Sequence, residues 1–320
     1  MNDYIGHPNQ LSGVEEYRLV GGKQDGMTIL SIRNGLGLEI HLSMSRACDI
    51  SRLYFKGISL GYFSPVGYVH PSYYDDKGIG FLKSFTAGFL TTCGLASIGK
   101  PCVDNNEELP LHGRISNTPC SSYYYEEDDE KIQVHALIKE EGIFSYKLSL
   151  NRTVTISKKD NSFSINDTVS NNGDNPYPVC ILYHMNMGYP LLSEKSILDI
   201  PSISIKGRTS LAQEELEQWN KIIKPTAGYE ERCYFHTFDK ERYASIYNPD
   251  IKTKLTMHFS DNLDYFTEWK MMGKRDYVLG LEPGNAHPDG RDQLRKENAL
   301  HYLKPNEKVN YEVKIFLEEK

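Results

Sequence analysis

The sequence contains no uninterrupted apolar stretch of the length that a membrane-spanning helix requires. It also lacks a cationic start followed by an apolar core, so we expect no secretory signal. No Cys-x-x-Cys pair or regular spacing occurs among its six cysteines, which are Cys48, Cys93, Cys102, Cys120, Cys180 and Cys233. Reduced thiols are therefore expected. Together these features predict a cytoplasmic protein without a membrane anchor.

A surplus of basic charge is absent as well. Lysine and arginine number 36 against 43 aspartates and glutamates, which gives a formal charge of −7. Nucleic acids and anionic membranes bind cationic surfaces, so we expect neither as a partner. The ten histidines form no His-x-His or His-x-x-x-His pair, and no glycine-rich phosphate-binding loop occurs. We therefore expect no metal and no cofactor, and a small molecule is the remaining class of partner.

Helical patterns are scarce, and strand patterns dominate the 320 residues. Apolar residues recur at every second position between clusters of Asn, Asp and Gly, as is typical of half-buried antiparallel strands. The clearest such segments are residues 27–43 (two strands), 131–139, 145–157, 162–170, 243–247, 252–259, 277–281 and 308–317. The acidic run of residues 126–130 lies between two such segments, which favours a solvated hairpin tip.

We expect one helix, which starts at Ser210 and Gln213 in a pattern like a capping box and continues to Trp219. Strands that follow strands, without alternating helices, indicate a sandwich rather than a nucleotide-binding α/β fold. No internal repeat or low-complexity linker divides the chain. The prediction is an all-β protein with one large antiparallel β-sandwich domain over residues 1–320, present as a monomer or a homodimer.

Three polar clusters interrupt the strand patterns, and each lies at the edge of an apolar run. They are Leu111-His112-Gly113-Arg114, residues 183–189 with His184, and Leu281-Glu282-Pro283-Gly284-Asn285. A β-framework can bring an acid and a base to one pocket in this way. Partial desolvation at a strand end is expected to raise the pKa of Glu282. Two structural alternatives stay open: Glu282 paired with an arginine, and His184 as a hydrogen-bonded structural residue.

In their order and context these clusters resemble the aldose 1-epimerase (galactose mutarotase) superfamily, and especially its uncharacterised bacterial branch. The resemblance runs from the strand near residue 27 to the last strand. It implies the large β-sandwich of that family, with Glu282 as the general base and His184 as the general acid. His112 would hydrogen-bond the sugar. Residues 85–95 would line the pocket floor, with Cys93 as an inert buried thiol.

The same resemblance supplies three further candidates for substrate binding. Arg114 would clamp hydroxyls, a carboxylate or a phosphate of the sugar, or else form a salt bridge that supports its loop. Glu230 stands where the family has an aspartate that holds sugar hydroxyls, and its charge would raise the pKa of His184. Arg46 either binds the ligand or is a buried arginine paired with Asp49. The arginine that precedes the family's His-Gly motif has no visible counterpart here.

The implied activity is interconversion of the α and β anomers of an aldose or an aldose derivative. Ring opening removes a proton from the anomeric hydroxyl and delivers one to the ring oxygen, and closure on the other face reverses both transfers. Two alternatives stay open because fold does not fix function. One is a non-catalytic carbohydrate-binding or sensing protein on the same scaffold. The other is an isomerase or lyase that acts on a modified sugar.

Overall fold

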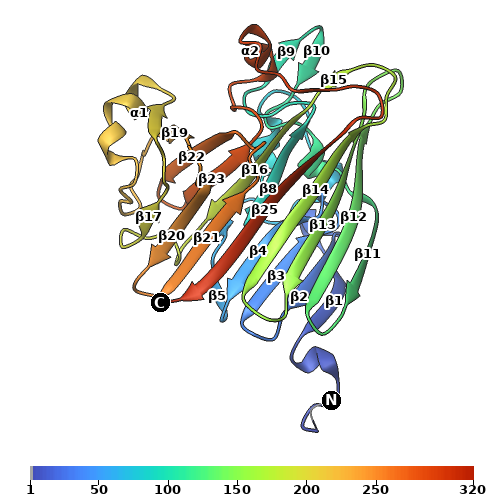
Figure 1. Ribbon diagram of the computed structural model, residues 1–320, viewed down its shortest axis with the longest axis vertical. Coiled ribbons are helices and arrows are strands. Elements are labelled where there is room, and N and C mark those ends of the chain that lie inside the picture. Colours follow the sequence, from blue (N-terminus) through green and yellow to red (C-terminus); the bar gives the residue numbers. More distant parts are fainter. Residues whose placement is uncertain (1–2) are drawn as a thin grey trace.

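The computed structural model describes residues 3–320, which form mainly antiparallel strands in three large sheets (Figure 1). The eight-stranded sheet has the order β11 (Cys120–Glu127), β12 (Lys131–Glu141), β13 (Lys147–Ser157), β14 (Ser162–Asn171), β25 (Lys308–Glu319), β21 (Thr253–Phe259), β20 (Tyr243–Asn248), β17 (Ile197–Asp199). It lies in front in Figure 1, and the other two large sheets form the layer behind it. The predicted antiparallel β-sandwich is therefore confirmed.

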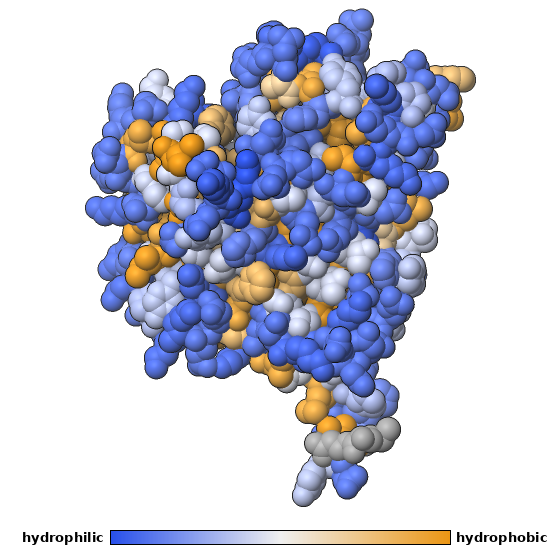
Figure 2. Space-filling model, viewed as in Figure 1, coloured by the Kyte–Doolittle hydropathy of each residue, from blue (hydrophilic) through white to orange (hydrophobic). Residues whose placement is uncertain are grey.

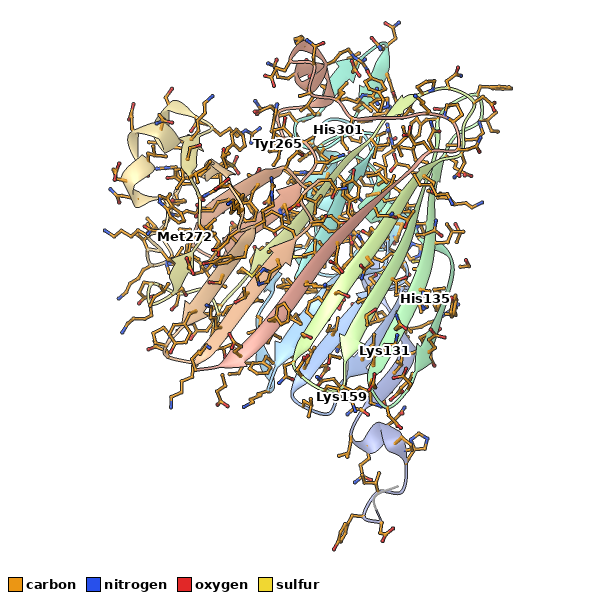
Figure 3. The ribbon with its side chains drawn as sticks, in the orientation of Figure 1. Lys131, His135, Lys159, Tyr265, Met272 and His301 are labelled. Carbon is orange, nitrogen blue, oxygen red and sulfur yellow. The ribbon has the colours of Figure 1, made fainter. Side chains whose placement is uncertain are left out.

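The rear layer consists of a six-stranded and a five-stranded sheet. The six-stranded sheet has the order β18 (Ser204–Gly207), β19 (Arg232–Thr237), β22 (Tyr265–Met272), β23 (Tyr277–Gly284), β16 (Cys180–Met187), β8 (Leu90–Leu95). The two end residues of β22 are labelled in Figure 3. The five-stranded sheet consists of β1 (Gly13–Arg18), β2 (Thr28–Arg33), β3 (Leu38–Ser43), β4 (Asp49–Phe55) and β5 (Ile58–Ser59).

Three two-stranded sheets complete the described strands. They pair β6 (Tyr62–Phe63) with β7 (Ala87–Gly88), β9 (Cys102–Asp104) with β10 (Glu107–Leu109), and β15 (Tyr177–Pro178) with β24 (Tyr302–Leu303). The acidic run of residues 126–130 spans the turn between β11 and β12, so the predicted hairpin tip is confirmed.

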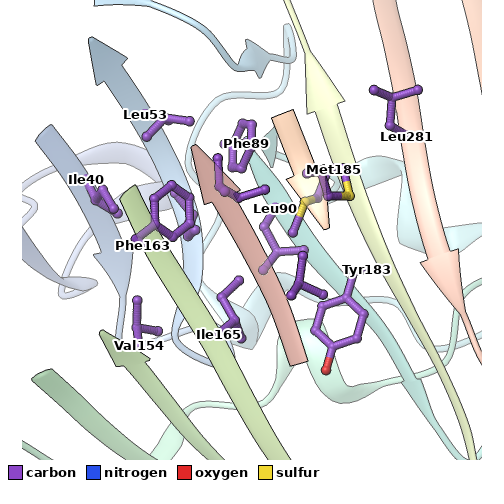
Figure 4. Packing of buried hydrophobic residues seen from close by; sticks show 14 of the residues in the cluster. Ile40, Leu53, Phe89, Leu90, Val154, Phe163, Ile165, Tyr183, Met185 and Leu281 are labelled. Carbon is purple, nitrogen blue, oxygen red and sulfur yellow. The ribbon is translucent and has the colours of Figure 1, made fainter. Parts of the chain in front are cut away.

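The hydrophobic core lies between the two layers (Figure 4). Phe163 and Ile165 of β14 meet side chains of the rear layer, and the rings of Phe163 and Phe89 lie 6.2 Å apart. Burial of each large apolar side chain contributes about 1.5–3 kcal/mol. Tyr183 and Met185 of β16 belong to this core. Because strand side chains alternate, the residues between and beside them face away from the eight-stranded sheet.

A buried ionic network joins the two layers. Arg152 of β13 pairs with Asp49 of β4 at 2.8 Å and with Asp167 of β14 at 2.7 Å. Arg152 also donates to the Thr92 hydroxyl of β8, and the Tyr183 hydroxyl donates to Asp167. Asp167 breaks the apolar alternation of its strand in the sequence, and the structure explains it as the partner of a buried arginine.

The helix prediction is partly wrong. α1 covers only Ser210–Glu214, and its cap is Thr209, whose side chain accepts a hydrogen bond from the Ala212 N–H. The α-helix does not continue to Trp219. Leu216–Gln218 forms a separate 3-10 turn instead. A second helix, α2 (Arg291–Lys296), escapes the sequence patterns because six residues are too few to show a helical period.

The visible surface is mostly hydrophilic, with hydrophobic residues scattered in small groups (Figure 2). Within residues 3–320, no helix has the length and apolar character that crossing a membrane requires.

Candidate active site

Glu282 and His184 come from neighbouring strands of the six-stranded sheet and lie on its face away from the core. Met185 of β16 is opposite Leu281 of β23, and both belong to the core. His184 and Glu282, one residue away on each strand, therefore share the other face. Their closest atoms, His184 Nε2 and Glu282 Oε1, are 3.3 Å apart. The predicted acid and base thus form one pair.

The Glu282 side chain folds back over a glycine on its own strand. Gly280 lies two residues earlier, on the same face of β23. A Cβ atom at Gly280 would lie 2.2 Å from Glu282 Oε1 and 3.1 Å from Trp269 Cβ. Real Cβ atoms do not come so close to an oxygen, so the carboxyl occupies the space that a side chain at 280 would need.

Aromatic rings surround the pair. The rings of Phe85, Trp269 and His112 lie 5.3, 5.3 and 5.4 Å from the His184 ring, mostly edge-on. Phe81 lies 5.2 Å from His112. The side chains of His184 and Glu282 are only 5% and 3% exposed. The pair is therefore largely shielded from water, which strengthens electrostatic interactions in the site.

His112 reaches the site from a loop that requires glycine at the next position. Gly113 has a φ of +72°, and a Cβ atom there would lie 2.2 Å from the Gly94 carbonyl oxygen. The loop is held by hydrogen bonds from the Gly94 N–H to the His112 carbonyl and from the Tyr74 hydroxyl to the Gly113 carbonyl. The structure thus brings together His112, His184 and Glu282, three residues that are remote in sequence.

Burial shifts the pKa of every titratable group in this cluster toward its neutral form. Burial raises the pKa of Glu282 well above its usual value, and the nearby Glu231 adds to this, while Arg208 opposes it. The raised pKa of Glu282 confirms the prediction. Burial lowers the pKa of His184 to about 4, and that of His112 well below its usual value. The expectation that a carboxylate raises the pKa of His184 is wrong, because desolvation dominates.

Several buried polar atoms of this face have no hydrogen-bond partner. They are His112 Nδ1, His184 Nδ1, Glu282 Oε1, Asn186 Oδ1 and Thr267 Oγ1. Thr267 lies directly opposite Glu282 in the sheet, and Asn186 lies opposite Gly280. Most buried polar groups in proteins are paired, so a concentration of unpaired ones on one sheet face is typical of a ligand site.

Arg114 lies beside the site loop but contacts other groups. Its guanidinium is 3.4 Å from Asp76 and donates to the Glu108 carbonyl at 3.0 Å. These contacts fit the loop-supporting alternative. The prediction that Arg114 clamps a substrate group stays a prediction.

Glu230 is exposed, and its backbone carbonyl accepts a hydrogen bond from Arg232. The next residue, Glu231, accepts a hydrogen bond from the Trp269 indole at 2.7 Å and acts on Glu282 through its charge. Glu231 is exposed too and contacts the described site through this bond, while the prediction that Glu230 binds the substrate stays a prediction. Sequence spacing alone cannot separate two adjacent glutamates in a loop.

Arg46 is buried and donates to the backbone carbonyls of Ser116, Val69 and Ser84, at 3.0, 3.2 and 2.6 Å. It does not form the expected pair with Asp49, because Asp49 pairs with Arg152. Burial lowers the pKa of Arg46 to about 10. Two of its acceptors lie in residues 64–86, the segment that carries Phe81 and Phe85. Arg46 thus supports the aromatic cover of the site, and its contact with a ligand stays a prediction.

Three contributors were missing from the sequence prediction. Trp269 and Glu231 are described above, and Arg208 is the third. Its charge acts on both Glu282 and His112, and its guanidinium donates to Asp289 at 2.8 Å. Trp269 stands between Glu268 and Lys270 on β22, both charged although buried, so apolar alternation does not mark it in the sequence. Arg208 lies just after β18 at the sheet edge and has no such signal either.

Cys93 is fully buried, and burial together with the Glu282 charge raises its pKa well above its usual value. The prediction of an inert thiol is confirmed. No group of three or more His, Cys, Asp or Glu residues among residues 3–320 has an arrangement that could hold a metal ion.

Comparison with known proteins agrees with the fold. Residues 24–317 match the family described as a domain of unknown function, DUF4432. The chain belongs to this family. No curated protein shows a significant match to the sequence.

Solved structures place this family among the mutarotase-like proteins. A candidate aldose 1-epimerase from Klebsiella pneumoniae is 28% identical, with 95% of this chain and 83% of that chain covered and a TM-score of 0.89. A galactose mutarotase-like protein from Clostridium acetobutylicum is 16% identical, over 98% and 100% of the chains, with a TM-score of 0.73. Galactose 1-epimerase from Lactobacillus acidophilus is 12% identical, over 96% and 99%, with a TM-score of 0.65. The predicted resemblance to the aldose 1-epimerase superfamily is therefore confirmed.

Proposed function

We propose that this protein is an aldose 1-epimerase-like isomerase that interconverts the α and β anomers of an aldose or aldose derivative. The observation that carries the proposal is the pairing of His184 Nε2 and Glu282 Oε1 at 3.3 Å in a shielded site with several unpaired polar atoms. An aldose supplies hydroxyl groups that can pair with such atoms, and it needs both a proton donor and a proton acceptor at its anomeric centre.

The chemistry needs one proton shared between the two residues. In ring opening, one residue takes the proton of the anomeric hydroxyl while the other gives a proton to the ring oxygen, and the bond between C1 and the ring oxygen breaks. After rotation about the C1–C2 bond, the reverse transfers close the ring on the other face. Each residue therefore acts once as an acid and once as a base.

The electrostatics of the site favour one starting arrangement. The pKa of Glu282 is raised and that of His184 is lowered to about 4, so the shared proton belongs on Glu282 before the sugar binds. The first transfers then run from Glu282 to the ring oxygen and from the anomeric hydroxyl to His184. This exchanges the starting roles that the family resemblance implies, while the residues and the overall reaction stay the same.

The substitution Glu282→Gln tests the proposal. It keeps the size of the side chain but removes the proton transfer, so anomerisation should fall by about 10²- to 10⁴-fold. The rate is measured by polarimetry or by NMR exchange between anomers, over a panel of neutral, acidic and phosphorylated aldoses. Sugar affinity, measured by calorimetry, should be largely retained.

Two results would contradict this proposal. If the unmutated protein binds a sugar but gives the same anomerisation rate as buffer over the whole panel, the protein is a carbohydrate-binding protein instead. If Glu282→Gln retains the full rate, the pair does not carry the reaction.

A further inference from the structure

Asn186 is a buried polar residue next to the catalytic pair, and neither the family resemblance nor the proposed function gives it a step in the reaction. It lies two residues after His184 on β16, so the two side chains share one face of the sheet. Its amide Nδ2 donates to the His184 carbonyl at 2.9 Å. With Nδ2 held in this way, the orientation of the amide is fixed, and its Oδ1 is buried without a partner.

The two ring nitrogens of His184 have different surroundings. Nε2 faces Glu282 at 3.3 Å, whereas Nδ1 is buried and lacks a partner. The Asn186 side chain and the His184 backbone both favour a proton on this ring as hydrogen-bond acceptors. A histidine's own carbonyl can approach only Nδ1, because that nitrogen is the one nearer the backbone. Asn186 Oδ1 is therefore an unpaired acceptor beside His184 Nδ1, an unpaired ring nitrogen that becomes a donor when it carries the ring proton.

We propose that Asn186 is a positioning residue that holds His184 in the tautomer with its proton on Nδ1, so that Nε2 is the reactive nitrogen. The orienting partner of a histidine sets which nitrogen carries the proton. A small rotation of the ring or the amide would form the hydrogen bond from Nδ1–H to Oδ1. Neither atom has another hydrogen-bond partner in its surroundings, and a buried unpaired polar atom is costly.

The consequence for the reaction rests on the proposed function. With Nδ1 protonated, Nε2 is a free acceptor and Glu282 holds the proton of the pair. The anomeric hydroxyl then gives its proton to Nε2 while Glu282 protonates the ring oxygen, which leaves an imidazolium next to a carboxylate. Ring closure returns both protons, so the site starts the next turnover unchanged.

Nitrogen-15 NMR of protein with labelled histidine tests the tautomer without any sugar. In the unmutated protein, the His184 shifts should show a protonated Nδ1 and an unprotonated Nε2. Asn186→Asp keeps an acceptor at the same place and should keep this tautomer, with the added charge raising the pKa of His184. Asn186→Leu removes the acceptor and should change the tautomer. Thr267→Val is the control, because it removes another unpaired oxygen from the same face and should leave the tautomer unchanged.

Activity supplies a second readout. Loss of an orienting partner typically costs about 10- to 100-fold, so Asn186→Leu should lower kcat by that factor with little change in KM, and Asn186→Asp should restore much of it. The acid limb of the pH–rate profile of Asn186→Asp should move to higher pH. Melting temperatures of all variants show whether each one is folded.

The inference is overturned if His184 carries its proton on Nε2 in the unmutated protein, or if Asn186→Leu leaves the tautomer unchanged. If Asn186→Leu does not fold, Asn186→Asp decides, because an unaltered His184 titration in that variant refutes the contact. A protein with the expected tautomer and no anomerisation would refute the proposed function and leave the role of Asn186 standing.

Discussion

At the scale of single residues, Glu230 and Glu231 are adjacent and both exposed, and Glu231 is the one whose side chain bonds a residue of the site. Glu231 accepts the Trp269 indole N–H at 2.7 Å, and Trp269 in turn packs against His184. Glu230 is exposed, and its only hydrogen bond among the described residues is made by its backbone. We infer that Glu231 holds the indole over the pair and is the carboxylate within reach of sugar hydroxyls.

This inference gives a matched pair of variants. Glu231→Gln should weaken sugar binding by about 1–3 kcal/mol, the usual range for a hydrogen bond to a charged group, whereas Glu230→Gln should change it by less than about 0.5 kcal/mol. Affinity is measured by calorimetry with the sugar that gives the fastest anomerisation. Equal losses in the two variants, or a loss confined to Glu230→Gln, would place the hydroxyl-binding carboxylate at Glu230 instead.

At the scale of elements, the strands β16, β23 and β22 present the residues of the site in two rows across the sheet. One row contains His184, Glu282 and Thr267, and the next contains Asn186, Gly280 and Trp269. The glycine in the second row leaves a gap that the Glu282 carboxyl and the Trp269 side chain fill from either side. β23 therefore positions Glu282 through the absence of a side chain two residues earlier.

Gly280→Ala tests this arrangement with a single added methyl group. The methyl would overlap Glu282 Oε1, so the carboxyl must rotate away from His184, and kcat/KM should fall by at least about 10-fold with the fold retained. Gly273→Ala in the turn before β23 is the control. Its added Cβ meets the flexible end of Met271 at 3.1 Å and the Asp276 carbonyl at 3.3 Å, so activity should stay within about twofold of the unmutated protein. Full activity of Gly280→Ala would show that the carboxyl does not need the gap.

The elements also show what the sequence can and cannot predict. β12, β13 and β14 bury every second side chain, so their alternation was readable. β8 and β16 are buried on both faces, because loops cover the side away from the core, and period-two patterns are lost there. His184 and Glu282 were identified through family motifs that the sequence placed at strand ends, whereas both lie inside β16 and β23, which continue to Met187 and Gly284. Arg208 acts through contacts between distant segments, which no local pattern reports, and the polar atoms of Asn186 gain meaning only once their burial is known.

At the scale of the whole molecule, the two layers meet in a polar centre as well as an apolar one. Arg152 lies fully buried between Asp49 and Asp167, with Thr92 and Tyr183 completing its hydrogen bonds. These residues come from strands of all three large sheets. Thr92 and Tyr183 also lie on β8 and β16, and Tyr183 directly precedes His184. The network therefore fixes the strand that carries the histidine relative to the rest of the sandwich.

Removing the central charge should accordingly destabilise the entire fold. Arg152→Met leaves two buried carboxylates without a counter-ion, a change that typically costs about 3–5 kcal/mol, and the surrounding strands cannot supply water in its place. Chemical denaturation measures the loss. Lys314→Met is the control, because Lys314 is 3.3 Å from Glu312 with both side chains about half exposed, and such surface pairs contribute only about 0–1 kcal/mol. If the two variants lose similar amounts of stability, Asp49 and Asp167 become protonated at little cost when Arg152 is removed. The two layers are then held together by apolar packing alone. A loss confined to Arg152→Met would instead show that the buried salt bridge of Arg152 stabilises the connection between the layers, to which β16 contributes Tyr183.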